Sequence, residues 1–554
     1  MKRWSYLFMA MGIATAFSAC SDEVDLSANN EESTEESTSQ VFMQFSLELP
    51  AVSRSTTQIG GGSDAGVEIG KDYENQVSEV LVVITDAKDD KFITGSTVTN
   101  LIPTGSNTTY VVPFNTNKLV NYVEKPVNIY VYCNPTSELK KGLESEDGID
   151  VNATYTLTSA ADETIWSITD GDNNTKNGHF LMTNADDDYV RTLPANLDNY
   201  KVESNPFDLE TINVERAAAR FDYKSSDADE TYTLMKDENG DPEVTITLTD
   251  MALVNLSKEF YYLRRVSADG TSTNAIIGDT ETNTNYVVDT DYDWKSGSTI
   301  TDYSGHFFYV YNKNSASADY TWTSISSLTN NDDDNNNSWN TNNSKGDYKI
   351  WRYATENTIP AKVSNQKKGI TTGVVFKGEI QGKGDMANLL NGENPVYVFD
   401  NILWGTWEDV EEAAEATESG NTTLANPLLA AAYNKAMEDP DASDTEIEKK
   451  AVDAGFTIFR PNTTTKKYEV LYYYWNRHND NDNNGSMGPM EFAVVRNNVY
   501  KLSVTGVNKF GHPTNPGDDP DPENPEDPDE EDDVYFKVAV EVLPWVVRIN
   551  DIEF

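Results

Sequence analysis

The sequence predicts an all-β protein made of antiparallel β-sandwiches, with a small helical insertion in its second half. Short strand-like runs rich in Val, Ile, Tyr and Phe recur along the chain, separated by clusters of Asn, Asp, Gly and Pro. Residues 72–214 show no sustained 3.6-residue apolar period, and helix signals gather in one stretch of the second half. Many short strands joined by turn clusters are typical of β-sandwiches.

Length and composition indicate a folded, multidomain protein. The chain has 554 residues, enough for two or three domains, and 38% of them are hydrophobic, including 29 Tyr, 20 Phe and 10 Trp. Its formal net charge is −50. Because nucleic acids and anionic membranes bind clusters of Lys and Arg, this charge excludes both as partners.

The first 19 residues read as a signal peptide. Lys2 and Arg3 precede an apolar run that ends in small residues before Cys20. This end is similar to a bacterial lipobox, with Phe17 where Leu is usual, so Cys20 is the expected lipidation site of a precursor. The alternative is ordinary secretion with an unmodified Cys20. The acidic residues directly after Cys20 are similar to the export signal of surface lipoproteins in Bacteroidetes.

A removable first strand is expected inside a propeptide that spans residues 20–54. Its side chains alternate, so that one face is apolar. An arginine in the polar, glycine-containing segment that follows is an accessible protease site, which predicts cleavage between Arg54 and Ser55. Losing the strand would open a strand-shaped groove. The apolar face comprises Val41, Met43, Phe45, Leu47 and Leu49.

Two helices are expected in the insertion. Asn426 is a capping residue ahead of Pro427, a proline in the first turn. Ser443 and Glu446 form a capping box, and Gly455 closes the second helix.

The chain ends in a tethered strand pair, residues 534–554. Residues 511–533 contain six prolines and eleven acidic residues, which predicts a flexible, solvated spacer. In the following strand, Lys537 and Glu541 face away from an apolar side. This strand either pairs with the sheet of another molecule or folds back into its own domain. The apolar side comprises Phe536, Val538, Val540 and Val542.

No catalytic or cofactor site is predicted. The four histidines are far apart in sequence, and no phosphate-binding loop, dinucleotide fingerprint or nucleophile motif occurs. Cys133 lies in a strand context and is expected to be a buried core thiol. Residues 480–491 match the EF-hand calcium pattern, but strands flank them, so the alternatives are a chance match in a hairpin loop and a calcium site. We expect no metal and no cofactor.

Several segments together resemble the fimbrillin family of Bacteroidales, in particular the major, or shaft, subunit of the short (minor) fimbriae of the type V pilus. The match is densest in the C-terminal half, and the acidic proline-rich spacer agrees with it. The resembling segments are residues 72–77, 131–136, 180–185, 214–222, 353–358, 369–378 and 472–502.

The resemblance implies a function and a domain plan. It implies two transthyretin-like sandwich domains, residues 55–213 and 214–510, with the helical insertion in the second. It also implies a lipoprotein precursor anchored in the outer membrane, trimming after Arg54, and polymerisation by exchange of the C-terminal strands into the groove of another copy. The expected protein is a non-enzymatic subunit of a cell-surface fimbrium. Its partners would be further copies, other fimbrial subunits and a host or bacterial surface ligand, in support of adhesion and biofilm formation.

Two alternatives to a shaft subunit stay open. One is a surface lipoprotein that binds a glycan or another ligand through aromatic residues such as Tyr261, Tyr262 and the run 472–475. The other is a tip or anchor subunit of a fimbria. An anchor should keep its first strand, and a tip should lack an exchangeable last strand.

Overall fold

The computed structural model describes most of the chain after residue 38. The described residues all belong to one compact unit, residues 39–554. The signal peptide and Cys20 lie outside them. The described ranges are 39–48, 68–99, 109–160, 165–170, 176–226, 229–267, 275–276, 286–291, 304–309, 320–329, 348–359, 370–418, 426–439, 441–478, 483, 487–488, 490–514 and 536–546.

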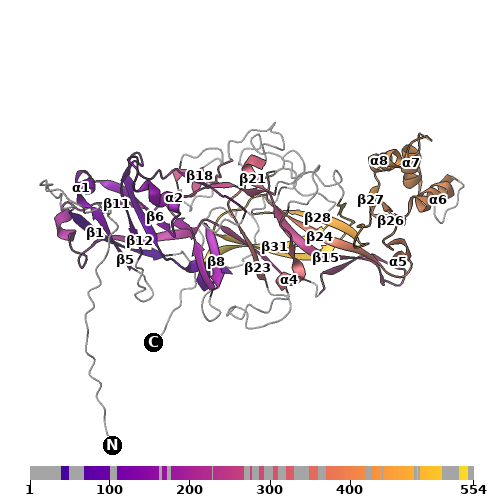
Figure 1. Ribbon diagram of the computed structural model, residues 1–554, viewed down its shortest axis with the longest axis horizontal. Helices are drawn as coiled ribbons and strands as arrows, with labels where there is room; N and C mark the ends of the chain where they lie inside the picture. Colours follow the sequence, from indigo (N-terminus) through magenta and orange to yellow (C-terminus); the bar gives the residue numbers. More distant parts are fainter. Residues whose placement is uncertain are drawn as a thin grey trace, which may run out of the picture. The chain divides into compact units, whose positions relative to one another are not determined.

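The first half of the chain builds one eight-stranded sheet. Its strand order is β4-β3-β6-β10-β12-β1-β5, with β11 beside β6. The end strands β4 and β5 contact each other, so the sheet curls over its own core. Figure 1 shows its strands in indigo and purple. The strands are β1 (Gln40–Glu48), β3 (Val80–Asp86), β4 (Phe92–Val98), β5 (Thr109–Asn115), β6 (Pro126–Cys133), β10 (Met182–Asn184), β11 (Val190–Thr192) and β12 (Phe207–Arg216).

Continuous apolar runs place these strands around a shared core. In β3 the first six residues are buried, and in β6 all residues after Pro126 are buried, because both strands lie in the middle of the sheet. Edge-side strands such as β5 alternate buried and half-buried residues instead. Cys133 in β6 is fully buried, as expected for a core thiol, and burial raises the pKa of its thiol.

The second half, together with the two-residue strand β2 (Glu68–Ile69) from the N-terminal part of the chain, forms a sandwich of two sheets. One sheet has the order β2-β31-β29-β13-β23, and the other has the order β14-β15-β24-β28-β30, with β22 beside β15. The strands of the first sheet are β2 (Glu68–Ile69), β31 (Phe536–Val546), β29 (Asn498–Val507), β13 (Ala219–Tyr223) and β23 (Lys349–Ala354). Those of the second are β14 (Thr231–Lys236), β15 (Pro242–Val254), β22 (Thr323–Ser324), β24 (Gly373–Gly382), β28 (Tyr468–Trp475) and β30 (His512–Pro513).

One hydrophobic cluster lies between these two sheets. Phe221 of β13 stacks on Tyr500 of β29, with ring centroids 5.1 Å apart. The opposite sheet contributes Ile246, Phe376 and Tyr472 to the same cluster. This cluster is separate from that of the first sheet, so each half of the chain has its own core. The predicted all-β class with sandwich architecture is confirmed.

The predicted helical insertion is present and holds three helices. Asn426 caps α7 by accepting hydrogen bonds from the amides of Leu428 and Leu429, and Ser443 begins α8 with the expected capping box. The helices lie at the same end of the molecule as a three-stranded sheet (Figure 1), and they share a small core with it. The elements are β25 (Val396–Phe399), β26 (Ile402–Gly405), α6 (Trp407–Glu418), α7 (Pro427–Ala436), α8 (Asp444–Asp453) and β27 (Thr457–Phe459).

Short elements connect the larger ones. No helix among the described residues is both long and apolar enough to cross a membrane. The short strands are β7 (Thr154–Thr156) with β17 (Glu259–Tyr261), β8 (Trp166–Asp170) with β9 (Lys176–Phe180), β16 (Leu256–Ser257) with β21 (Phe307–Phe308), and β18 (Arg265–Ser267) between β19 (Ala275–Ile276) and β20 (Tyr286–Val287). The short helices are η1 (Asp72–Asn75), α1 (Thr116–Leu119), η2 (Val120–Tyr122), α2 (Ser137–Gly142), η4 (Leu197–Tyr200), α4 (Ile325–Thr329) and α5 (Met386–Leu389).

Candidate functional site

The first strand, β1, occupies an interior place in its sheet. It runs parallel to β12 on one side, where Met43 is opposite Phe207. On the other side it runs antiparallel to β5, where Phe45 is opposite Tyr110. Within the described residues, β5 joins the strand order only through β1. Taking β1 out would therefore leave a slot with an unpaired strand edge on each side.

The inward face of β1 belongs to the core. Val41, Met43 and Phe45 have no solvent exposure, and the ring of Phe45 stacks on that of Tyr110 with centroids 5.3 Å apart. Leu47 is half-buried, and Leu49 lies outside the described residues. Because burying a large apolar side chain contributes about 1.5–3 kcal/mol, an empty slot would expose a strongly apolar cleft.

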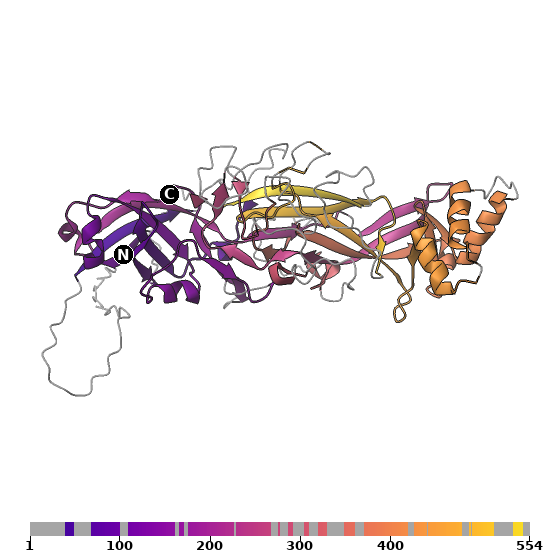
Figure 2. The same ribbon diagram turned by 90° about the horizontal axis from the view of Figure 1, so that it is seen from above.

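The last strand, β31, pairs within its own second-half sheet (Figure 2). This is the folded-back placement, one of the two that the sequence left open. Its antiparallel ladder with β29 extends from Phe536 to Pro544, whereas its parallel pairing with β2 covers only Trp545 and Val546. The predicted exchange residues lie opposite β29 in the pairs Phe536–Val507, Val538–Val504, Val540–Leu502 and Val542–Tyr500.

The segment between β29 and β31 is far longer than its task in this chain requires. Val507 pairs with Phe536, so residues 508–535 connect two adjacent strands of one sheet, and on the way they pass through β30 of the other sheet. Hairpin loops usually need two to five residues, and long loops in compact domains are usually functional or linkers. The length of this segment is therefore not explained by the fold of one chain.

The start of this segment is structured, which corrects the predicted beginning of the spacer at Gly511. His512 and Pro513 form β30 and pair with Leu471 and Val470 of β28. Gly511 passes close to β28: an added Cβ would lie 2.4 Å from the Leu471 carbonyl oxygen. The glycine and proline that suggested flexibility instead serve a close approach and a short bridge at a sheet edge. Residues 515–535 lie outside the described residues.

Three predicted site residues, Cys20, Arg54 and Ser55, also lie outside the described residues. Lipidation and cleavage stay predictions. Asp480 and Asp482 of the calcium match also lie outside the described residues. Its last position, Glu491, is described and is fully buried. Its carboxylate accepts a hydrogen bond from the amide of Gly488 at 2.6 Å and lies 3.6 Å from Arg477. Among the described residues, no group of three or more His, Cys, Asp and Glu is arranged to hold a metal ion.

The aromatic residues considered for a ligand site contribute largely to packing. Tyr262 and Tyr472 are almost fully buried in the two main cores. Tyr473 and Trp475 are half-buried, stack on each other and pack against a smaller cluster on the other face of β24 and β28. Nothing in their arrangement favours a glycan site over core packing.

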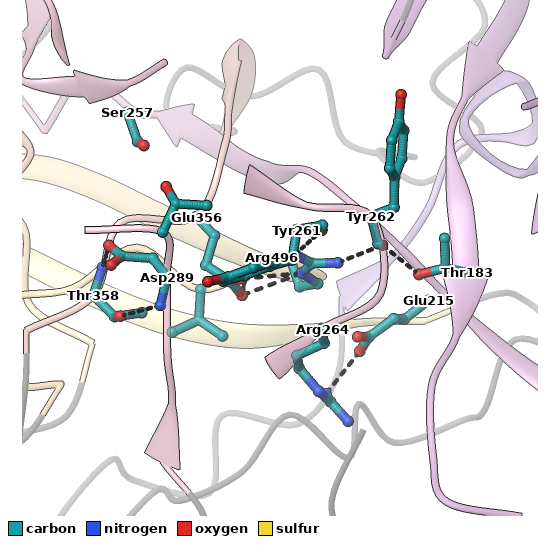
Figure 3. A network of polar contacts seen from close by, with 12 residues as sticks. Thr183, Glu215, Ser257, Tyr261, Tyr262, Arg264, Asp289, Glu356, Thr358 and Arg496 are labelled. Atoms are coloured by element: carbon teal, nitrogen blue, oxygen red, sulfur yellow. Dashed lines mark hydrogen bonds and ion pairs between the residues drawn. The ribbon is translucent and has the colours of Figure 1, made fainter. Parts of the chain in front are cut away.

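A buried polar network, which sequence reasoning missed, connects the two halves (Figure 3). Arg496, directly before β29, lies against Glu356 with Nη2–Oε2 at 3.0 Å and Nε contacts at 3.2 Å. It also donates to the backbone carbonyls of Tyr261 and Tyr262, at 2.8 and 3.1 Å. The Tyr262 carbonyl accepts a further hydrogen bond from Thr183 of the first sheet.

The same network takes in the end of β12. Glu215 pairs with Arg264 at 2.9 Å, and both side chains are buried. Burial raises the pKa of Glu215 to about 7, against the opposing effect of Arg264. The next residue, Arg216, donates to the Asn497 side chain at 3.2 Å. Strand β12, which flanks β1, thus ends beside the start of β29, which pairs with β31.

A second buried cluster surrounds Arg220 of β13. Its guanidinium contacts Asp222 at 2.8 Å, Glu74 of η1 at 2.9 Å and Glu68 of β2 at 2.9 Å. Glu68 also pairs with Lys501 of β29 at 2.6 Å. Charged residues inside apolar strand runs, as in residues 214–222, were the sequence signal for both clusters. Buried charges of this kind require partners, which the sequence alone does not name.

Comparison with known proteins identifies the C-terminal region. Residues 466–551 match the family described as major fimbrial subunit protein type IV, fimbrillin, C-terminal. This segment contains β28, β29, β30 and β31, and it covers the part in which the sequence resemblance was densest. The match confirms the fimbrillin resemblance there and supports a structural, non-enzymatic fimbrial subunit at the cell surface. That the chain is the major, shaft subunit of the short (minor) fimbriae stays a prediction.

Solved structures add context. A fimbrilin from Porphyromonas gingivalis is 12% identical, with 91% of this chain and 98% of that chain covered and a TM-score of 0.37. A tip fimbrial protein from the same organism is 10% identical, with 91% and 100% covered and a TM-score of 0.32. Because these TM-scores and sequence identities are so low, the assignment of the C-terminal region to the fimbrillin family rests on the family match alone. No curated protein matches the chain.

Proposed function

We propose that this chain, whose C-terminal region is that of a fimbrillin, is the shaft subunit of a fimbria that polymerises by donor-strand exchange. The precursor is exported as a lipoprotein, held in the outer membrane through Cys20, and cut between Arg54 and Ser55. The cut releases β1, and the last strand of a neighbouring copy fills the slot. The partners are further copies and other fimbrial subunits, and the filament supports adhesion to a host or bacterial surface and biofilm formation.

The position of β1 is the observation that carries this proposal. It precedes the predicted cut, it lies between β12 and β5, and it buries Val41, Met43 and Phe45 completely. An interior strand that is removed must be replaced, because its neighbours would otherwise keep unpaired backbone groups beside an apolar cleft. A replacement strand would run in the direction of β1, parallel to β12 and antiparallel to β5.

The tail supplies a suitable replacement. Residues 515–535, if extended like polyproline, would span roughly 65 Å from the fixed root at Pro513. That reach exceeds what the hairpin between β29 and β31 needs. The strand itself is the apolar, alternating run that begins at Phe536.

Three chains test strand exchange directly. A chain that begins at Ser55 should form ladders on SDS gels run without boiling. The full chain should remain monomeric because β1 fills its slot, and the chain 55–533 should remain monomeric because it lacks the tail. Ladders from the chain 55–533 would exclude exchange through β31.

A peptide competition isolates the slot. A synthetic peptide of residues 40–48 should block ladder formation by the chain that begins at Ser55. The same peptide with Met43→Asp and Phe45→Asp should not block it, because two charges would enter the apolar cleft. Equal inhibition by both peptides would show that the slot is not the site of assembly.

Processing has its own tests. Mass spectrometry of shed filaments should find Ser55 as the first residue, and a mature chain that begins at Cys20 would contradict the proposed cut. Labelled palmitate should be incorporated into the natural chain but not into Cys20→Ala. Absence of label in the natural chain would exclude the lipid.

A further inference from the structure

The tail strand β31 is covered at one edge by a very short strand that partly buried ion pairs help to hold in place. The strand is β2, and its two residues pair with Trp545 and Val546. In the order β2-β31-β29, β31 lies between β2 and β29. Two residues of backbone pairing are a weak attachment by themselves, so the ion pairs of Glu68 should add substantially to it.

Glu68 joins β2 to the two strands beyond the tail. Its carboxylate contacts Arg220 of β13 at 2.9 Å and Lys501 of β29 at 2.6 Å. The Arg220 side chain is 1% exposed, and those of Lys501 and Glu68 are 15% and 21% exposed. Burial works to raise the pKa of Glu68, but Arg220 and Lys501 together lower it below its ordinary value. Both contacts are therefore charge-assisted at neutral pH.

The surroundings keep the rest of this cluster intact when Glu68 changes. Arg220 retains Asp222 and Glu74, and Glu74 accepts a further hydrogen bond from Tyr353 at 2.6 Å. η1 follows β2 directly and is tied to β12 by a hydrogen bond from Arg216 to the Glu74 carbonyl. Loss of the Glu68 carboxylate should thus free β2 without unfolding the sandwich.

We propose that β2 and Glu68 form a clasp that keeps the tail strand in its own subunit and must open before the tail can leave. This deepens, and rests on, the proposed strand exchange. The clasp lies after Ser55 in the sequence, so the proposed cut removes β1 but not the clasp. A trimmed subunit therefore has an open slot while its own tail is still held. Glu68 acts as a positioning residue: it keeps β2 against the tail until the clasp opens.

Hydrogen exchange of the untrimmed monomer tests the clasp without any polymerisation. Glu68→Gln should speed amide exchange in residues 536–546 by roughly tenfold, as expected for the loss of a charge-assisted contact. The increase should be largest toward Val546, beside β2, and smallest toward Phe536. Amides of β15 and β24 should keep their natural rates, which shows that the sandwich stays folded.

A matched control separates the clasp from general charge effects. Glu379 pairs with Lys467 at 2.7 Å, and its side chain is 17% exposed, but this pair lies on β24 and away from the tail. Glu379→Gln should leave exchange in residues 536–546 unchanged. Equal effects of Glu68→Gln and Glu379→Gln on tail exchange would overturn the proposal. It would also be overturned if Glu68→Gln left the exchange rates of residues 536–546 within twofold of those of the natural chain.

A second variant addresses the same contact from the other side. Lys501→Gln should reproduce the exchange gradient of the tail, also if Glu68→Gln fails to fold. The double variant Glu68→Gln with Lys501→Gln should exchange the tail amides little faster than Glu68→Gln alone, because both substitutions remove the same Glu68–Lys501 pair. Full additivity of the two variants would contradict a clasp.

Assembly kinetics distinguish the clasp from the proposed function itself. In chains that begin at Ser55, Glu68→Gln should shorten the time to ladder formation, whereas Glu379→Gln should not. Faster tail exchange without ladders from any trimmed chain would support the clasp and refute strand exchange. Faster ladders from Glu379→Gln as well would refute the clasp.

Discussion

The strands β1 and β31 are both predicted to take part in exchange, but they are held very differently. β1 has a long partner on each side and a fully buried inward face. β31 has one long partner, β29, and on its other side only the two residues of β2. Removing β1 without replacing it is therefore costly in stability, whereas β31 can leave its sheet more easily. Under the proposed function, this difference sets the direction of assembly: tails leave their own sheets to fill slots.

The largest expected effect comes from Arg496, because it touches both halves. Arg496→Met would leave the buried Glu356 carboxylate without its main partner and should destabilise the chain by about 3–5 kcal/mol. Denaturant unfolding should show the loss with probes in both halves. Arg460→Met, which removes a half-exposed pair with Glu448, should change stability by less than about 1 kcal/mol. A loss confined to one half would mean that the network does not couple them.

Phe45→Ala should weaken the β1 position alone. Removing a fully buried ring that stacks on Tyr110 should lower the stability of the untrimmed chain by about 3–5 kcal/mol. Exchange should rise in β1 and β5 but not in β31. Ser46→Ala, on the opposite face of the same strand, removes one exposed hydrogen bond to Thr211 and should have little effect. Similar losses from both substitutions would mean that β1 is not anchored by its apolar face.

Acid should loosen the sheet of β31 and spare that of β1. Burial lowers the pKa of His478 to about 4, and its Nδ1 bonds to Tyr500 of β29, which lies opposite the tail. Because the unfolded chain binds this proton near pH 6.5 and the folded chain does not, stability is full above pH 6.5 and falls as the pH drops toward 4. The loss should be on the order of 3 kcal/mol. His478→Gln should remove this slope in urea unfolding, and an unchanged slope would assign it to other groups.

The smallest effect on stability is expected in the helical insertion, which contains neither β1 nor β31. Ser443→Ala removes half of the capping box of α8 and should lower stability there by about 1 kcal/mol. Circular dichroism should show less helix on heating, while exchange in β1 and β31 stays unchanged. A change in either strand would mean that the insertion is coupled to the exchange positions.

The sequence predicted the strand content and the two capped helices because these depend on local signals. The alternation in residues 41–47 places β1 correctly, and Asn426 and Ser443 begin their helices as expected. Helix α6 was missed, although Thr406 and Asp409 bond each other at its start, because its acidic face hides the apolar pattern.

Long-range pairing was beyond local signals. Which strands flank β1, and the partnership of β2 with β31, depend on contacts across hundreds of residues. For the same reason the sequence did not single out Arg496 or Glu68, whose partners lie far away along the chain. The placement of His512 and Pro513 in a sheet was also unpredictable, since only β28 gives these residues a reason to be extended.

The meeting of Arg216 and Asn497 has a mechanical consequence. One ends β12, beside the slot, and the other precedes β29, beside the tail. In a filament built as proposed, tension would enter each subunit along β12 and leave it along β29. Strand ladders pulled along their length share the load among many hydrogen bonds in shear, so they resist well. The link between β12 and β29 would then carry this load: the chain runs from β12 through Ala217 and Ala218 into β13, which pairs with β29, and the Arg216–Asn497 contact lies beside this link.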